Sequence, residues 1–364
     1  MKAVFDLKEA MDKKMISTNR KVVTFGEVML RLTAPDFRRF SQTNEFIATY
    51  GGSEANVAVS LANFGIPTEF VTRLPDNAMA QACIASLRAN GLGTEGIVFG
   101  GKRMGLYFLE SGASFRNSNV VYDREGSSFA TLRPGMIDWE KIFADADWFH
   151  WSGIAASLSQ EGADACLEAL QTADRMGLTI SCDLNVRKKL WNYGRSVADV
   201  MLPLVQYSNV IFGAEPEYKE VFDIAPVGFQ AVDTAYPLDL KGFETFGQKI
   251  SHIVPRCRKV FLELRNTITS NHNLLAAVLY SDQTLKYTGI YDITHEVDRV
   301  GTGDAFVGGM IYGLLTYPDN DQKALEFALA ASALKNTVYG DFNQVTVEEV
   351  ESRMKGNTSG RVAR

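Results

Sequence analysis

The chain has 364 residues, of which 46% are hydrophobic and 22% are charged, and its formal net charge is −6. This composition is typical of a globular protein with a sizeable core, and the negative balance disfavours binding to nucleic acid or to an acidic membrane surface. No apolar run is long enough to cross a bilayer, and residues 1–20 lack the continuous hydrophobic segment of a secretory signal. We interpret residues 1–20 as an N-terminal extension and residues 351–364 as a C-terminal tail.

Four cysteines and four histidines are scattered along the chain without the paired spacing of a zinc site or a disulfide framework. The cysteines are Cys83, Cys166, Cys182 and Cys257. Because unpaired cysteines are typical of a reducing compartment, we expect the protein to be cytoplasmic.

Apolar strands alternate with helical patterns between residues 21 and 350. Strands are expected at 21–25, 68–74, 147–152, 178–183, 209–212, 259–264 and 274–280, and helices at 53–64, 76–90, 159–176, from 304 onward, and at 322–338. Ser53, Asp76 and Ser159 are expected to cap the first three helices. The alternation predicts an α/β fold with a doubly wound, mainly parallel sheet and helices on both of its faces.

Two segments interrupt this alternation, at about 27–50 and 105–132. Both contain short stretches in which apolar residues alternate with charged or aromatic ones, as in Met29-Leu30-Arg31-Leu32. Neither has the composition of a buried parallel strand. We expect the two segments to form a small antiparallel sheet that projects from the main domain as a lid.

The stretch Gly301-Thr302-Gly303-Asp304 precedes a segment, 305–315, that is apolar on every side and suits a buried helix. The first amides of a helix lack internal partners and carry the positive end of the helix dipole, so this glycine turn is expected to bind an anion. A carboxylate beside a bound phosphate is repelled by its like charge, so its presence there suggests a role in the chemistry. Asp304 is therefore a candidate general base, which removes a proton from a hydroxyl as that oxygen attacks a phosphoryl group.

Two other interpretations of this stretch follow from its residues. Asp304 is also suited to an ordinary helix cap or to a carboxylate that complements the helix dipole. A dinucleotide fingerprint is excluded, because Phe306 stands where that motif needs a third glycine.

Further polar groups follow predicted strands, where ligands of doubly wound sheets bind. The segment from Gly51 to Asn56 opens the first long helix, either as an ordinary turn or as part of a site. Asp183-Leu184-Asn185-Val186-Arg187 follows a buried strand, and a guanidinium there can hold a carboxylate or a phosphate with two bonds.

The early Gly51-Gly52…Asn56 and the late Gly301-x-Gly303-Asp304, with βα units between them, resemble the motifs of the ribokinase-like (phosphofructokinase-B-type) carbohydrate kinases. The resemblance spans roughly residues 22–344. Within the family the chain is most similar to 2-keto-3-deoxygluconate kinases. That similarity is carried by Tyr107, Tyr122-x-Arg124, Asp183-x-Asn185-x-Arg187 with Leu190-Trp191, and Gly340-Asp341.

The resemblance implies transfer of a phosphoryl group from ATP, with Mg²⁺, to the primary hydroxyl of a sugar acid, above all 2-keto-3-deoxy-D-gluconate, forming the 6-phosphate. It implies Asp304 as the base, with the amides of Gly301, Thr302 and Gly303 around the phosphoryl group. The implied sugar contacts are Gly52, Ser53, Glu54, Asn56, Tyr107, Tyr122, Arg124, Arg187 and Asp341. The implied nucleotide contacts are Asn185, Arg187, Leu264, Arg265, Gly301 and Gly303.

The chain departs from the family pattern in three places. Glu217 remains from the family's Asn-x-x-Glu, where Ala214 replaces the asparagine, and is a candidate for a water-mediated contact to magnesium. The segment 263–267 replaces a Thr-Leu-Gly nucleotide loop, and Arg299 and Thr302 replace small residues. Two alternatives stay open: a kinase for a neutral sugar of the fructose or ribose type, and a non-catalytic sugar-binding relative.

The only partners expected are the sugar and ATP, together with a second copy of the chain. The apolar lid residues are Leu106, Phe108, Val120 and Val121. An uncovered apolar strand pair is a liability in solution, so a homodimer that forms through the lid is predicted.

Overall fold

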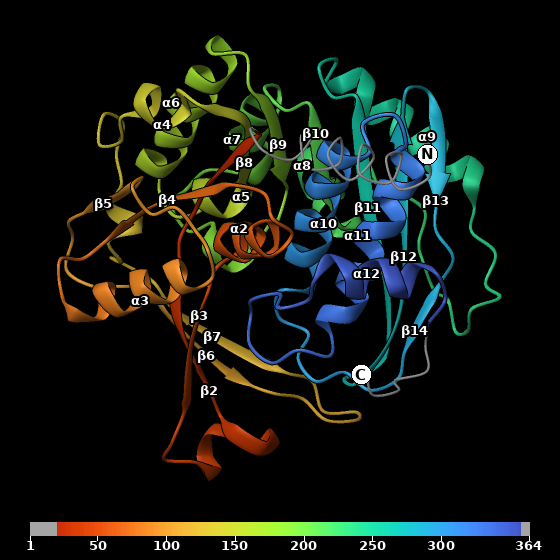
Figure 1. Cartoon of the computed structure of the whole chain (residues 1–364), viewed down its shortest axis with the longest axis horizontal. Helices are drawn as coiled ribbons and strands as arrows, with labels where there is room; N and C mark the ends of the chain where they lie inside the picture. The colour runs from red at the N-terminus through yellow and green to blue at the C-terminus, as the bar shows by residue number, and fades with distance from the viewer. Residues whose placement is uncertain (1–19, 358–364) are drawn as a thin grey trace, which may run out of the picture.

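The computed structural model describes residues 20–357 and contains a ten-stranded main sheet, helices on both of its faces, and a separate four-stranded sheet that projects from it (Figure 1). Apart from Arg20, the expected N-terminal extension lies outside the described residues. The boundary expected at residue 350 falls within helix α12 (Val347–Met354). No helix in the described part of the chain has the length and apolar character needed to span a membrane.

The main sheet has the strand order β13-β12-β11-β10-β9-β8-β1-β4-β5, with β14 paired to β12. The strands are β1 (Lys21–Phe25), β4 (Thr68–Leu74), β5 (Ile97–Phe99), β8 (Ala146–Ser152), β9 (Thr179–Asp183), β10 (Val210–Gly213), β11 (Lys259–Thr269), β12 (His272–Ser281), β13 (Thr284–Tyr287) and β14 (Tyr291–Ile293). Every pairing from β11 to β5 is parallel, as predicted. Strand β12 pairs antiparallel with β11, β13 and β14, which the sequence did not reveal. Only Ser270 and Asn271 separate β11 from β12, and so short a connection joins antiparallel strands.

Helices cover both faces of this sheet, as the alternating pattern predicts (Figure 1). They are α2 (Ser53–Asn63), α3 (Ala78–Ala89), α4 (Trp139–Phe143), α5 (Gly153–Ala156), α6 (Gln160–Arg175), α7 (Val197–Val205), α8 (Glu215–Phe222), α9 (Leu240–Ile253), α10 (Thr302–Thr316), α11 (Asp321–Lys335) and α12. Successive strand residues point to opposite faces. Phe149 accordingly packs in the cluster that contains α4 to α9, whereas its neighbour Trp148 packs in the cluster that contains α10, α11 and α12.

The helix starts correct two of the three predicted caps. Ser159 caps α6, with its side chain accepting a bond from the amide of Gly162. Helix α3 begins at Ala78, and its cap is Asn77, which accepts a 3.0 Å bond from the amide of Ala80, so Asp76 is not the cap. Helix α2 begins at Ser53 with Gly52 in the cap position, because the hydroxyl of Ser53 is bonded elsewhere.

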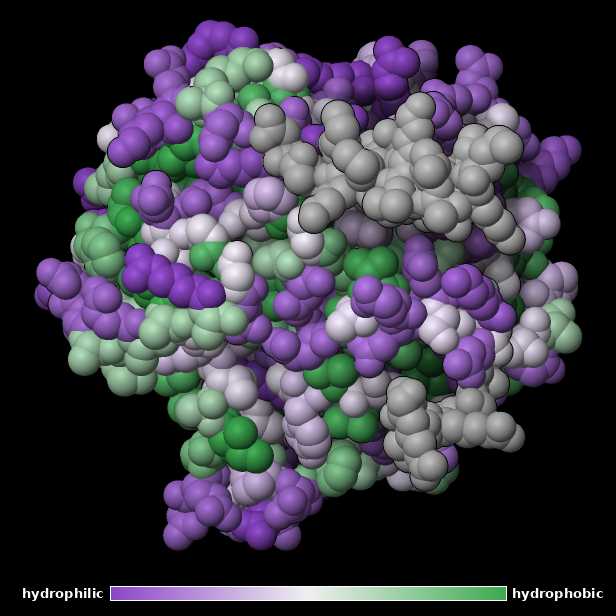
Figure 2. Space-filling model, viewed as in Figure 1, coloured by the Kyte–Doolittle hydropathy of each residue, from purple (hydrophilic) through white to green (hydrophobic). Residues whose placement is uncertain are grey.

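The projecting sheet, here called the lid, consists of β2 (Met29–Thr33), β3 (Ile47–Gly51), β6 (Leu106–Glu110) and β7 (Asn119–Asp123) in the order β3-β2-β6-β7. It lies at the lower edge of the main sheet in Figure 1, and the space-filling view shows a hydrophilic far end with hydrophobic residues above it (Figure 2). The predicted small lid sheet is present and two of its pairings, β2–β3 and β6–β7, are antiparallel as expected, but β2 and β6 pair parallel. Both follow parallel strands of the main sheet, β1 and β5, and therefore leave that sheet in the same direction.

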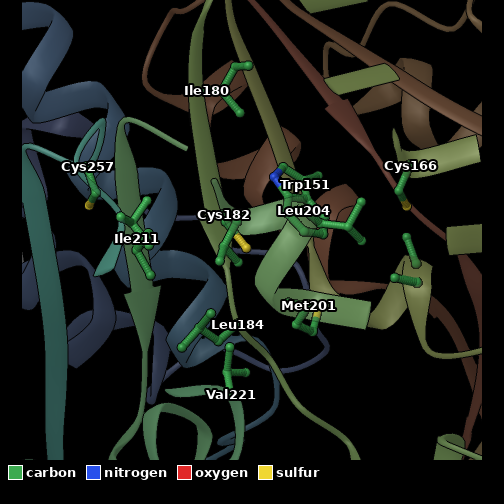
Figure 3. Close-up of a cluster of buried hydrophobic side chains, with 14 of the residues drawn as sticks. Trp151, Cys166, Ile180, Cys182, Leu184, Met201, Leu204, Ile211, Val221 and Cys257 are labelled. Atoms are coloured by element: carbon green, nitrogen blue, oxygen red, sulfur yellow. The ribbon is translucent and has the colours of Figure 1, made fainter. Parts of the chain in front are cut away.

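All four cysteines are free and buried. Cys166, Cys182 and Cys257 lie apart from one another within the large apolar cluster that also contains Trp151 and Leu184 (Figure 3). Burial raises the pKa of the Cys257 thiol to about 12. These thiols are therefore side chains of the core rather than reactive groups.

Candidate active site

The glycine turn before α10 has the conformation that the sequence predicts for an anion site. Gly301 has φ 83° and ψ 2°, and a Cβ atom on it would lie 2.1 Å from the carbonyl oxygen of Asp341. Only glycine fits this position, because both the left-handed backbone and the close contact exclude a side chain. The first helical bond is donated by Ala305 to Gly301, so the amides of Gly303 and Asp304 have no acceptor within the helix.

The carboxylate of Asp304 lies at the start of α10 and faces two donors from α2. Ser53 Oγ donates to Oδ1 at 2.9 Å, and Asn56 Nδ2 donates to Oδ2 at 2.7 Å. Burial raises the pKa of Asp304 to about 6, although the bonds from Asn56 and Ser53 oppose this shift. The group is therefore an ionised carboxylate at neutral pH that accepts a proton more readily than an exposed aspartate.

A cavity of about 650 Å³ opens in front of this carboxylate, between the lid and the carboxyl ends of the parallel strands. The predicted site residues that line it are Gly52, Ser53, Asn56, Tyr107, Tyr122, Arg124, Asn185, Arg187, Glu217, Arg265, Gly301, Thr302, Gly303, Asp304 and Asp341. The cavity thus brings together segments from both ends of the chain at the sheet edge where ligands of such folds bind.

Two predicted contact residues, Glu54 and Leu264, do not line the cavity. Glu54 is buried behind the first turn of α2, where its Oε1 accepts a bond from the hydroxyl of Ser152. Leu264 belongs to the apolar core, because alternate residues of β11 face opposite sides, and its neighbours Glu263 and Arg265 take the cavity face. Neither side chain therefore faces the cavity.

The two arginines expected to meet a substrate carboxylate both have acidic partners in the protein. Arg124 is 5% exposed, and its Nε donates to Glu27 Oε2 at 2.8 Å. Arg187 has a side chain that is 45% exposed, and its Nη1 lies 3.4 Å from Glu217 Oε1. Arg187 is thus the more available of the two for an incoming anion.

A buried network around Arg31 was missed in the sequence. Arg31, on lid strand β2, is 1% exposed and donates from Nη2 to Asp298 at 2.5 Å and from Nη1 to Asp341 at 2.7 Å. The hydroxyl of Tyr107, on β6, also donates to Asp341 at 2.6 Å. Burial by itself lowers the pKa of Arg31, but Asp341, Tyr107 and Asp298 raise it above its ordinary value.

This network fastens the lid to the glycine turn. Asp298 Oδ1 accepts a 3.1 Å bond from the amide of Val300, and its Oδ2 accepts one from Gly340. The ammonium of buried Lys335 donates to the carbonyl oxygens of Asp298 and Val338, which join the same two segments. One signal was available in the sequence, since a period of two places the charged Arg31 on the same lid face as the apolar Met29.

The acidic side of the cavity is formed by Asp183 at the end of β9 and Glu217 in the first turn of α8. Burial raises the pKa of Asp183, and the neighbouring Glu217 raises it further. Burial also raises the pKa of Glu217, against the effect of Arg187. Two carboxylates in one partly buried place favour a cation or a proton between them.

Comparison with known proteins places this geometry in a family. The model of the pfkB family carbohydrate kinases matches residues 19–235 and 273–346. The 2-dehydro-3-deoxygalactonokinase of Haloferax volcanii is 31% identical over 345 residues, which cover 93% of this chain and 98% of the relative.

Solved structures agree with this match. The 2-dehydro-3-deoxygluconokinase of Thermotoga maritima is 39% identical with a TM-score of 0.85, and the alignment covers 93% of this chain and 100% of that one. A PfkB family carbohydrate kinase from Listeria grayi is 29% identical with a TM-score of 0.83, and covers 92% of this chain and 100% of that one. The chain therefore belongs to the pfkB family of carbohydrate kinases.

Proposed function

We propose that the protein transfers the γ-phosphoryl group of ATP to the primary hydroxyl of a 2-keto-3-deoxy sugar acid, and that 2-keto-3-deoxy-D-gluconate, which becomes the 6-phosphate, is its substrate. The observation that carries this proposal is the position of Asp304, whose carboxylate faces the cavity beside the free amides that open α10. A base next to an anion site suits the transfer of a phosphoryl group to a hydroxyl.

In this reaction Asp304 takes the proton of the sugar hydroxyl as the oxygen attacks phosphorus. Ser53 and Asn56 hold the carboxylate in position, each through one hydrogen bond. The amides of Gly303 and Asp304 stabilise the negative charge on the transferring group. The lid covers the sugar and excludes water, which would otherwise take the place of the sugar hydroxyl.

The cavity suits the Mg²⁺ that accompanies ATP. Among residues 20–357, no group of three or more acidic, histidine or cysteine side chains is arranged to hold a metal by itself. Asp183 and Glu217 supply two carboxylates at the cavity, and magnesium is commonly held by one or two carboxylates together with substrate phosphates and water. When bound, Mg²⁺ offsets the negative charge of the phosphate oxygens.

Two observations favour an acid over a neutral sugar. The basic residues Arg187 and Arg124 lie with Tyr107 and Tyr122 on the cavity wall, as an acid with several hydroxyls requires. The relatives from T. maritima and H. volcanii carry names of kinases for the gluconate and the galactonate forms of one keto-deoxy acid. The galactonate form is therefore the second candidate substrate.

The test is an assay of ADP release with a panel of both keto-deoxy acids, fructose and ribose. The proposal predicts that the gluconate form has the highest kcat/KM. A higher kcat/KM for the galactonate form would change only which epimer is the proposed substrate. A higher kcat/KM for fructose or ribose would refute the proposal that the substrate is a sugar acid. Saturable sugar binding without turnover on any member would favour a non-catalytic relative.

Arg187→Ala is expected to raise KM for the acid substrate about 10-fold or more, because a charge-assisted bond to the carboxylate is lost. KM for a neutral sugar, measured with the same preparation, should change much less. Lys188→Ala, which removes the exposed neighbour that pairs with Glu220, serves as the control. Equal changes for acid and neutral sugars would contradict a carboxylate contact at Arg187.

The activity is expected to fall as the pH drops through about 6, because the folded-state pKa of Asp304 is raised to about 6 and only its ionised form accepts a proton. Asn56→Ala removes a bond that opposes this shift, so the acid limb of kcat/KM should move to higher pH. Asn63→Ala, at the far end of α2, should leave the limb in place. A limb that arises from titration of the nucleotide would not move in either variant.

A homodimer through the lid remains part of the proposal. Ile47 on β3 and Val121 on β7 are about half exposed on the lid. Val121→Glu is expected to convert a dimer to a monomer in a sizing experiment, whereas Val232→Glu, at an exposed apolar residue outside the lid, should not. A monomeric wild-type protein would refute the dimer.

The free cysteines suit the expected cytoplasmic location.

A further inference from the structure

The cavity wall next to the glycine turn carries two arginines, Arg265 and Arg299. Arg265 comes from β11, and its Nη2 donates a 2.7 Å bond to Oγ1 of Thr302, the first residue of α10. Arg299 lies two residues before Gly301. Its partly buried side chain forms no hydrogen bond or ion pair with any residue between 20 and 357.

Each of the other arginines around the cavity has a carboxylate partner, although the side chain of Arg187 stays 45% exposed. Arg31 contacts two aspartates, Arg124 contacts Glu27, and Arg187 contacts Glu217. The excess positive charge of the cavity therefore lies on the wall beside the glycine turn.

Two carboxylates, Glu296 and Glu263, act on Arg299 through their charge, but neither forms an ion pair with it. The carboxylate of Glu263 lies 3.7 Å from Arg265 and accepts a closer bond, of 2.6 Å, from Ser332. Burial lowers the pKa of Arg299, and the like charge of Arg265 lowers it further. Two neighbouring guanidinium groups in a partly buried site are stabilised when an anion binds to both.

Arg265 comes from a segment that the family model does not match. The family model leaves residues 236–272 unmatched, and Arg265 lies within that gap. The bond from Arg265 to Thr302 nevertheless holds this segment against the start of α10. The unmatched segment thus places the positive charge of Arg265 next to the amides of Gly303 and Asp304, which have no acceptor within α10.

We propose that Arg265 and Arg299 bind the polyphosphate chain of the nucleotide, and that Arg299 is a catalytic residue that neutralises the departing diphosphate. This inference rests on the proposed kinase function. In the transfer, the sugar oxygen bonds to the γ-phosphorus and its proton passes to Asp304. The bond from the γ-phosphorus to the bridging oxygen breaks, and the diphosphate keeps the electron pair. The diphosphate gains negative charge in this step, and a guanidinium stabilises that charge more strongly than a neutral amide does.

The test measures nucleotide affinity by calorimetry, without sugar and therefore without turnover. Arg299→Ala is expected to weaken binding of ADP and of tripolyphosphate by about 10- to 100-fold, while adenosine binding changes by less than about 3-fold. In activity assays kcat should fall, and KM for the sugar should stay nearly constant. The Tm of the variant should fall only slightly, because Arg299 forms no hydrogen bond or ion pair and acts on the buried Glu296 through its charge alone.

Two matched variants accompany this measurement. Arg299→Lys keeps the positive charge and should restore part of the ADP affinity. Arg88→Ala removes an arginine of α3 that bonds Thr94 away from the cavity, and should leave ADP affinity unchanged.

Unchanged ADP affinity in Arg299→Ala would overturn the inference, and so would a loss confined to the sugar acid, which would assign Arg299 to the carboxylate instead. If the wild type binds and phosphorylates its sugar, and Arg299→Ala has the same ADP affinity and kcat, this inference is refuted while the proposed function stands. A wild-type protein that binds neither ADP nor ATP would refute the proposed function itself.

Discussion

Asp304→Asn is expected to lower kcat about 10²- to 10⁴-fold, which is the usual contribution of a positioned general base. The amide has nearly the same size as the carboxylate, so Ser53, Asn56 and the start of α10 keep their positions. What is lost is the ability to accept a proton from the sugar hydroxyl. Nucleotide affinity should be retained or increased, because the variant removes a negative charge next to the phosphate site.

Rapid-quench measurement of the first turnover separates this chemical step from product release. Asp319→Asn, in the exposed turn that follows α10, is the matched control and should behave like the wild type. Turnover of Asp304→Asn within a few-fold of the wild type would show that another group accepts the proton.

Arg31→Met is expected to destabilise the protein by about 3–5 kcal/mol, the usual result of removing one partner from a buried ion pair. The substitution leaves Asp298 and Asp341 buried, close together and without their shared cation. An unpaired buried carboxylate is costly, so most of the expected loss comes from these two side chains.

The measurement is the free energy of unfolding by urea at neutral pH. Arg116→Met gives the matched control, because Arg116 lies in the loop between β6 and β7, has a side chain that is 25% exposed and pairs with only one carboxylate, that of Glu110, so its removal should cost less than that of Arg31. Adding Asp298→Asn to Arg31→Met should recover part of the lost stability. Equal losses in Arg31→Met and Arg116→Met would mean that the buried network contributes little.

The fold could be predicted from the sequence wherever local patterns decide it. The parallel strands and the all-apolar helix α10 follow from periodicity, and the glycine turn follows from Gly301 and Gly303. The direction of β6 relative to β2 could not be predicted, because it depends on the main-sheet strands that precede each of them rather than on the lid residues.

The site could be predicted only in part, for a related reason. Asp304 and Asn56 belong to short motifs, so the sequence identifies them, and their contact follows from the fold. Arg31 lies 267 residues before Asp298, and nothing in either segment indicates that the two side chains meet. The motif gives the place of Glu54 in the chain but not the direction of its side chain, which points to Ser152 and away from the cavity.

The connection from lid strand β3 to helix α2 has a consequence for how a new specificity arises in this scaffold. Strand β3 ends at Gly51 and α2 begins at Ser53. A single residue, Gly52, therefore separates the lid from Ser53 and Asn56, the side chains that hydrogen-bond Asp304. A Cβ atom on Gly52 would lie 2.0 Å from the carbonyl oxygen of Glu27, so the backbone at this connection is closely packed and only glycine fits there. Under the proposed function, substitutions that move lid strand β3 to fit a different sugar are therefore expected to move the first turn of α2 as well. Variants that broaden substrate choice should lose catalytic rate until a second change realigns Asp304.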